Sequence, residues 1–168
     1  MRRMIVFDSM VLIHLAKTNL LRDAVLFYKK GLIPPAVYGE TVAAGKAAGY
    51  ADALEIEKEI KSGKILVKKP KKAQLLMFEN LGLRGGEGES AALAREHGLL
   101  LATDDDAVKS RKIVLKIELV GTIAIIVKMA NSGKIEKKRA LASFLMLRKI
   151  GWFSSAVLDK ARMVVENV

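Results

Sequence analysis

The chain has 168 residues, which is enough for one ordinary domain with a buried core. Hydrophobic residues make up 51% and charged residues 28%, a composition that is typical of a folded globular protein and argues against disorder. There is no cysteine, which excludes disulfides, thiolate zinc sites and cysteine nucleophiles, and the formal net charge is +11.

Apolar stretches in the sequence are too short for a membrane span or a signal peptide. The first apolar run is stopped by Asp8, and the longest candidate is closed by Glu118 and Lys128. A membrane-spanning helix needs about 20 apolar residues. Together with the absence of cysteine, this predicts a soluble, cytoplasmic protein.

Hydrophobic periodicity predicts short strands that alternate with helices. The predicted strands are 4–7, 32–33, 64–70, 99–102 and 116–119. The predicted helices are 11–17, 21–31, a helix after Pro34 and Pro35, 50–63, 71–82, 86–98, 106–114 and three stretches beyond. This alternation indicates an α/β fold with a mainly parallel sheet, covered by helices on both faces.

The domain organisation is predicted to be simple, because the sequence shows no internal repeat, linker or low-complexity stretch. We expect a single domain over residues 1–168, with a core at about 4–130 and C-terminal helices at 135–166.

Acidic residues recur where predicted strands end or helices begin. Asp8 ends the first strand, Glu40 and Glu87 lie in the first turns of helices, and the run 103–106 (TDDD) follows the strand 99–102. Each acid alone is explained as a cap or as a partner of the helix dipole. Because the carboxyl ends of parallel strands meet at one edge of the sheet, the acids could instead converge there. A divalent cation would then offset their mutual repulsion.

Five stretches, in their order along the chain, resemble the PIN domain, and in particular its branch related to VapC-type toxins. They are IVFDSMVLIHLAK, IPPAVYGETV, GEGESAALA, LLATDDDAVKSR and LVGTIAIIVKMA. The resemblance runs from about residue 4 to residue 150. It implies a three-layer α/β/α sandwich and a ribonuclease that uses Mg²⁺ or Mn²⁺ to cleave single-stranded RNA, acting as the toxin of a toxin–antitoxin pair.

The resemblance also implies which side chains act. The implied catalytic acids are Asp8, Glu40, Glu87, Asp104 and Asp105. All of these except Glu40 are implied metal ligands, and the implied supporting residues are Ser9, Thr103 and Glu89, with Glu89 as a second-choice ligand. Asp106 is expected to cap the next helix. Family members usually carry Ser or Asn where this chain has Met10, so a polar contact that supports the metal site is missing here unless Ser9 substitutes for it.

Positive charge is concentrated in residues 107–149, which hold 11 Lys and Arg against two Asp and Glu. This excess favours a polyanion or an acidic protein as partner, although a solvated lysine-rich surface explains it equally well. Lys109 and Arg111 are candidates for holding RNA phosphates, or are ordinary surface charges. His14 and His97 are predicted to be structural. The partners expected are RNA, an antitoxin protein and a second copy of the chain in a homodimer.

Two alternatives to the enzyme remain. One is a PIN-like module of weak catalytic power that binds RNA or protein. The other places the main interaction with protein, through the basic stretch 137–153, where Leu141, Phe144 and Leu145 recur at helical spacing. That spacing is more often a sign of core packing.

Overall fold

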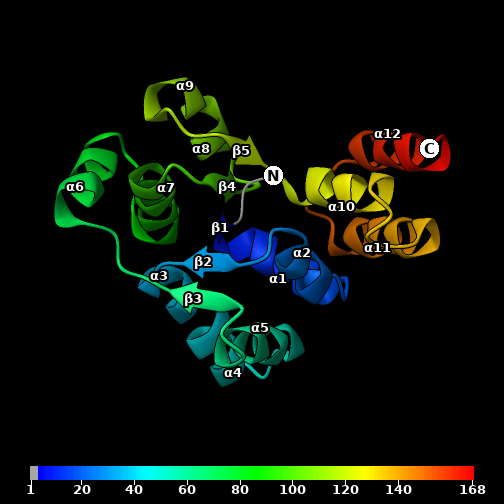
Figure 1. The fold of residues 1–168 in the computed structure, drawn as a ribbon, viewed down its shortest axis with the longest axis horizontal. Helices are drawn as coiled ribbons and strands as arrows, with labels where there is room; N and C mark the ends of the chain where they lie inside the picture. The colour runs from blue at the N-terminus through cyan, green and yellow to red at the C-terminus, as the bar shows by residue number, and fades with distance from the viewer. Residues whose placement is uncertain (1–3) are drawn as a thin grey trace.

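The computed structural model describes residues 4–168, and its centre is a five-stranded parallel sheet. The strand order is β3-β2-β1-β4-β5 (Figure 1). The strands are β1 (Ile5–Phe7), β2 (Gly31–Ile33), β3 (Ile65–Val67), β4 (Leu100–Ala102) and β5 (Leu119–Val120). Every neighbouring pair runs parallel, which confirms the α/β fold expected from the alternating pattern.

Helices connect the strands and extend beyond the last one. Before β4 they are α1 (Ser9–Lys17), α2 (Leu21–Phe27), α3 (Pro35–Tyr38), the π-helical turn η1 (Gly39–Ala43), α4 (Ala44–Ala47), α5 (Ala51–Lys61), α6 (Lys72–Asn80) and α7 (Gly85–His97). After β4 they are α8 (Asp106–Ser110), α9 (Lys112–Leu115), α10 (Thr122–Asn131), α11 (Lys137–Ile150) and α12 (Ser155–Glu166).

The sheet separates two hydrophobic cores because side chains alternate along each strand. Ile5 and Phe7 of β1 face the core formed with α1, α2, α5 and the C-terminal helices. Val6 faces the other core, formed with α6, α7, α8 and α9. The helices on opposite sides of the strands in Figure 1 are these two outer layers, so the three-layer α/β/α sandwich is confirmed.

Strand register brings the polar ends of β1 and β4 together. Phe7 pairs with Ala102, and the Asp8 backbone N–H donates to the Ala102 carbonyl at 2.9 Å. Asp8 and Thr103 therefore follow the strands side by side at the carboxyl edge of the sheet.

Several predicted elements have different bounds in the structure, including the strand expected over 64–70, which ends at Val67. The helix expected over 21–31 ends at Phe27, and Gly31 begins β2 instead of capping that helix. A Cβ at Gly31 would lie 2.9 Å from Cε2 of Phe7, so the close approach of β2 to this ring requires glycine. The helix expected over 106–114 is divided into α8 and α9. Lys116 has a left-handed φ of 51° that ends α9, so the last strand begins at Leu119.

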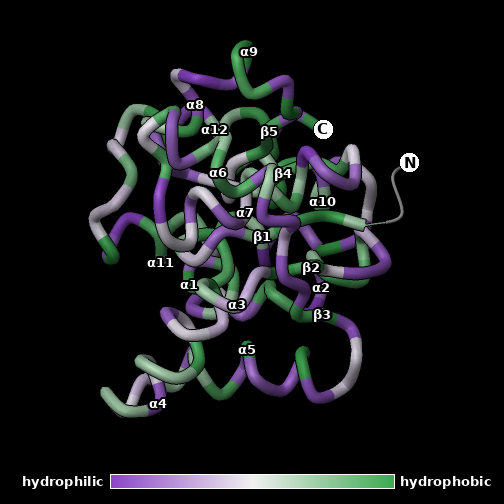
Figure 2. Tube along the Cα trace, turned by 90° about the vertical axis from the view of Figure 1, so that its left-hand side faces the viewer, coloured by the Kyte–Doolittle hydropathy of each residue, from purple (hydrophilic) through white to green (hydrophobic). Residues whose placement is uncertain are grey.

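The surface helices α5 and α11 bury one face against the core. Along α5, hydrophobic and hydrophilic segments alternate (Figure 2), and the buried side chains are the apolar Ala53 and Ile56 together with Glu59. On α11 the prediction of core packing is correct for Phe144, which is buried, but wrong for Leu145, whose exposed fraction is 62%. Within residues 4–168, none of the helices combines the length and apolarity that crossing a membrane requires.

Candidate active site

Asp8 occupies the junction between β1 and α1 and is almost completely buried. As the N-cap of α1, its Oδ1 accepts a hydrogen bond from the Ser9 backbone N–H at 2.8 Å. Its Oδ2 accepts from the Thr103 hydroxyl at 3.0 Å. Both donors are uncharged, so these contacts fix the position of the carboxylate without neutralising it.

Glu40 reaches the same region from the π-helical turn η1. Its Oε2 accepts a short hydrogen bond from the Ser9 hydroxyl, and its Oε1 accepts from the Gly86 backbone N–H at 3.2 Å. Gly86 lies in the first turn of α7, and a Cβ there would stand 2.7 Å from Oε2 and 2.8 Å from Oε1. The absence of a side chain at Gly86 therefore lets Glu40 join the N-terminal ends of α1 and α7.

Glu87 and Asp105 complete a group of four acids, which we call the carboxylate cluster: Asp8, Glu40, Glu87 and Asp105. Glu87 lies next to Gly86 in α7, and its carboxyl group hydrogen-bonds with that of Asp105. Asp105 follows β4, and its backbone N–H donates to the Thr103 hydroxyl oxygen at 3.1 Å. Thr103 thus links Asp105 to Asp8, to which its own hydroxyl donates.

Burial and mutual repulsion raise two pKa values in the carboxylate cluster. Desolvation by burial, with smaller contributions from the charges of Glu40 and Asp105, raises the pKa of Asp8 to about 6. Desolvation, followed by the charge and hydrogen bond of Asp105, raises the pKa of Glu87 to about 7. The negative charges of the cluster therefore repel one another, and a bound cation would relieve this repulsion.

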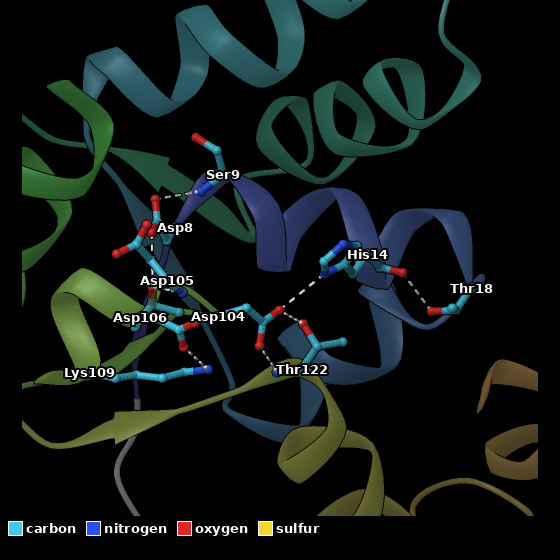
Figure 3. Close-up of polar contacts among 10 residues, drawn as sticks. Asp8, Ser9, His14, Thr18, Asp104, Asp105, Asp106, Lys109 and Thr122 are labelled. Carbon is cyan, nitrogen blue, oxygen red and sulfur yellow. Dashed lines mark hydrogen bonds and ion pairs between the residues drawn. The ribbon is translucent and has the colours of Figure 1, made fainter. Parts of the chain in front are cut away.

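Asp104 is adjacent in sequence but points away from the cluster, toward α1 and α10 (Figure 3). Its Oδ2 lies 3.1 Å from Nδ1 of His14 and accepts from the Thr122 hydroxyl, and its Oδ1 accepts from the Thr122 backbone N–H at 2.9 Å. Although burial opposes it, these hydrogen bonds from His14 and Thr122 hold the pKa of Asp104 below its ordinary value. The structure therefore places Asp104 in a contact that joins α1, β4 and α10.

Glu89 and Asp106 lie outside the carboxylate cluster, where Glu89 accepts a backbone hydrogen bond and Asp106 is exposed to solvent. Glu89, considered above as a second-choice ligand, accepts from the Ala36 backbone N–H at 3.0 Å and so stabilises the start of α3. The expectation that Asp106 caps α8 is wrong, because the helix begins at Asp106 itself. Asp105 is the N-cap, and its Oδ1 accepts from the Val108 backbone N–H at 3.0 Å, whereas the Asp106 side chain is 99% exposed.

The comparison with known proteins agrees with the parallel α/β/α fold. Residues 4–167 match a family model described as a PIN domain. The chain belongs to the PIN-domain family. No significant match was found among curated proteins, nor among solved structures. PIN domains are generally nucleases and typically use divalent metals.

The predicted phosphate-binding residues of this PIN domain lie on and just after α8. The Lys109 ammonium is 3.6 Å from the Asp106 carboxylate, with which it forms an ion pair (Figure 3). The Arg111 guanidinium donates to the Ala107 carbonyl at 2.8 Å. Lys109 therefore pairs with an acid at the start of α8, and Arg111 binds a carbonyl of the same helix.

The two histidines have the contacts of structural residues. His14 is completely buried and packs against Phe153, with ring centroids 5.1 Å apart. His97 lies in the last turn of α7, with Nε2 3.5 Å from the Glu96 carboxylate.

The donor set of the carboxylate cluster fits a hard divalent cation. Mg²⁺ and Mn²⁺ prefer carboxylate oxygens, and all four members supply them. Among the residues that the structure describes, no group of three or more acidic or histidine side chains stands ready to hold a metal ion. Glu40 is exposed and Glu87 half-buried, so both have room to change rotamer, whereas Asp8 is held in place by two hydrogen bonds.

The raised pKa of Asp8 predicts how the metal-free protein responds to pH. Because the folded-state pKa of about 6 lies above the ordinary 3.8, protonation of Asp8 stabilises the fold at low pH, and this contribution is lost as pH rises through 6. The loss amounts to about 3 kcal/mol at most. In EDTA, the contribution of Asp8 to the melting temperature should fall between about pH 4 and about pH 7, and Asp8→Asn should remove it. Asp106→Asn is the matched control, and an equally steep dependence in Asp8→Asn would contradict the electrostatic account.

Proposed function

We propose that this PIN domain is a divalent-metal-dependent ribonuclease that hydrolyses phosphodiester bonds in single-stranded RNA. The observation that carries the proposal is the carboxylate cluster itself. Four acids from β1–α1, η1, α7 and β4–α8 interact at the carboxyl edge of the sheet, where Asp8 and Glu40 receive only the uncharged hydrogen-bond donors described above.

In the proposed reaction, Asp8, Glu87 and Asp105 hold Mg²⁺ or Mn²⁺, and Glu40 fixes the helix ends around them. When bound, such an ion supplies the Lewis acidity that activates water and offsets the charge developing on the phosphate. Thr103 orients Asp8 and Asp105 through its single hydroxyl group. Ser9 takes the place of the polar residue missing at Met10, since its hydroxyl holds Glu40. Lys109, which pairs with Asp106 at the start of α8, attracts the phosphate backbone in this reaction.

The protein partners that the sequence resemblance implies are part of this proposal. Apolar side chains are exposed on and between the C-terminal helices, among them Leu145, Met146, Trp152 and Met163. A homodimer or an antitoxin would cover them, and the antitoxin would then inhibit the nuclease.

A cleavage assay on the purified chain tests the enzymatic proposal. The expected result is hydrolysis of a labelled single-stranded RNA with Mg²⁺ or Mn²⁺ that stops when EDTA is added. RNA binding without cleavage in either metal would favour the non-catalytic binding module instead. Cleavage that persists in EDTA would contradict the role of the metal.

A further inference from the structure

A groove begins beside the carboxylate cluster and follows the edge of the sheet. Thr103, the residue that links Asp8 to Asp105, also lines a cavity of about 290 Å³. The other walls of this cavity come from α8, α9 and the edge strand β5, through Lys109, Lys112, Leu119, Val120 and Gly121.

A second cavity of about 470 Å³ continues from the first, because Lys112 and Leu119 line both. Its remaining walls are formed by Leu100, Ile113, Ile117, Glu118 and Lys128. We call the two together the β5 groove. It extends from Thr103, which contacts two members of the cluster, past α9 and β5 to the exposed Lys128 on α10.

The charged side chains that line the β5 groove are mainly positive, which favours binding of a polyanion. Lys109, Lys112 and Lys128 are exposed and come from three different helices. One acid, Glu118, lines the walls that these residues form. Phosphates of a strand lying in the groove would therefore meet lysines in succession, starting at the acids.

An apolar side chain in the same wall distinguishes between a single strand and a duplex. Ile113 is 83% exposed, and the hydrophobic α9 projects from the outside of the molecule in Figure 2. A duplex keeps its bases stacked inside, whereas an unpaired base can lie against an apolar side chain. Ile113 therefore favours an unpaired strand.

We propose that the β5 groove binds the segment of single-stranded RNA that adjoins the scissile phosphate. Lys112 and Lys128 bind its phosphates, and Ile113 contacts an unpaired base. This inference rests on the proposed ribonuclease function and adds where the strand lies.

The lysines are tested by RNA binding, measured with a fluorescein-labelled single-stranded RNA in EDTA so that no cleavage occurs. The double variant Lys112→Ala/Lys128→Ala should lower the affinity about tenfold or more. It should also reduce the slope of log affinity against log salt by about 1.4, the value for two lost phosphate contacts with a single strand. The control Lys30→Ala/Lys58→Ala removes the same charge from exposed lysines before β2 and at the end of α5, away from the groove. It should change both quantities much less, and equal losses in the two double variants would overturn the proposal.

The base contact is tested by two neighbouring substitutions on α9. Ile113→Ser should weaken single-strand binding severalfold but leave duplex binding unchanged. Val114→Ser is the matched control, because Val114 is 62% exposed but does not line the groove. Displacement of the RNA by poly-glutamate as effectively as by unlabelled RNA would instead assign the groove to an acidic protein and overturn the proposal.

The outcomes separate this inference from the proposed function. Metal-dependent cleavage with an affinity that is insensitive to Lys112 and Lys128 would refute the groove alone. Loss of affinity in the lysine variant of a protein that cleaves no RNA in either metal would support the groove and refute the ribonuclease.

Discussion

Asp8→Asn is expected to lower the metal-dependent cleavage of single-stranded RNA by roughly 100-fold or more, because the change removes a charged ligand that the fold holds in place. Asparagine keeps the size of the side chain and can still accept the Ser9 N–H, so the start of α1 should remain intact. RNA binding should survive or improve, since the lysines of the β5 groove are untouched and one repulsive charge is gone. The cleavage rate and the affinity are measured on the same preparation.

The matched control for this variant is Asp106→Asn. It removes the same charge four residues after the end of β4, but from a side chain that is almost completely exposed. Its cleavage rate should stay close to that of the unmodified chain. Equal rates for Asp8→Asn and Asp106→Asn would show that the chemistry lies elsewhere.

Gly86→Ala is expected to reduce cleavage by at least about tenfold with little loss of stability. The new methyl group would stand 2.7–2.8 Å from both Glu40 carboxylate oxygens, closer than any packed contact. Because Glu40 is exposed and its side chain is flexible, the carboxylate rather than the backbone would move, and its contacts with Ser9 and Gly86 would be lost.

The control for this prediction is Gly39→Ala, next to Glu40 in the π-helical turn. Gly39 has helical dihedral angles, and a Cβ there meets nothing within 4 Å. Alanine should therefore preserve activity and stabilise the fold by about 0.5 kcal/mol. Thermal melts and cleavage rates of both variants check the prediction, and full activity in Gly86→Ala would contradict the role given to Glu40.

Much of the architecture could be predicted from local pattern. Buried apolar runs identified β1 and β4, and hydrophobic periodicity placed most helix ends within a few residues. The errors in element bounds arose where contacts between distant residues determine the local structure. Gly31 is indistinguishable from a helix C-cap in sequence, and only the ring of Phe7 shows why it belongs to β2.

The contacts of the two neighbouring aspartates were equally hidden in the sequence. Asp104 and Asp105 have similar sequence surroundings, but their side chains point in different directions. The partners of Asp104 are His14 and Thr122, respectively 90 and 18 residues away. No local pattern reports such distant partners. The importance of Gly86 was likewise hidden, because it depends on Glu40, 46 residues earlier.

The central claim is that the carboxylate cluster binds the catalytic metal, and direct Mn²⁺ binding tests it most closely. Calorimetric titration of the metal-free chain at pH 7.5 should show saturable binding in the unmodified chain and in Asp106→Asn. Binding should be lost or weakened at least about tenfold in Asp8→Asn. Mn²⁺ binding of equal affinity in Asp8→Asn, or none in the unmodified chain, would contradict the account.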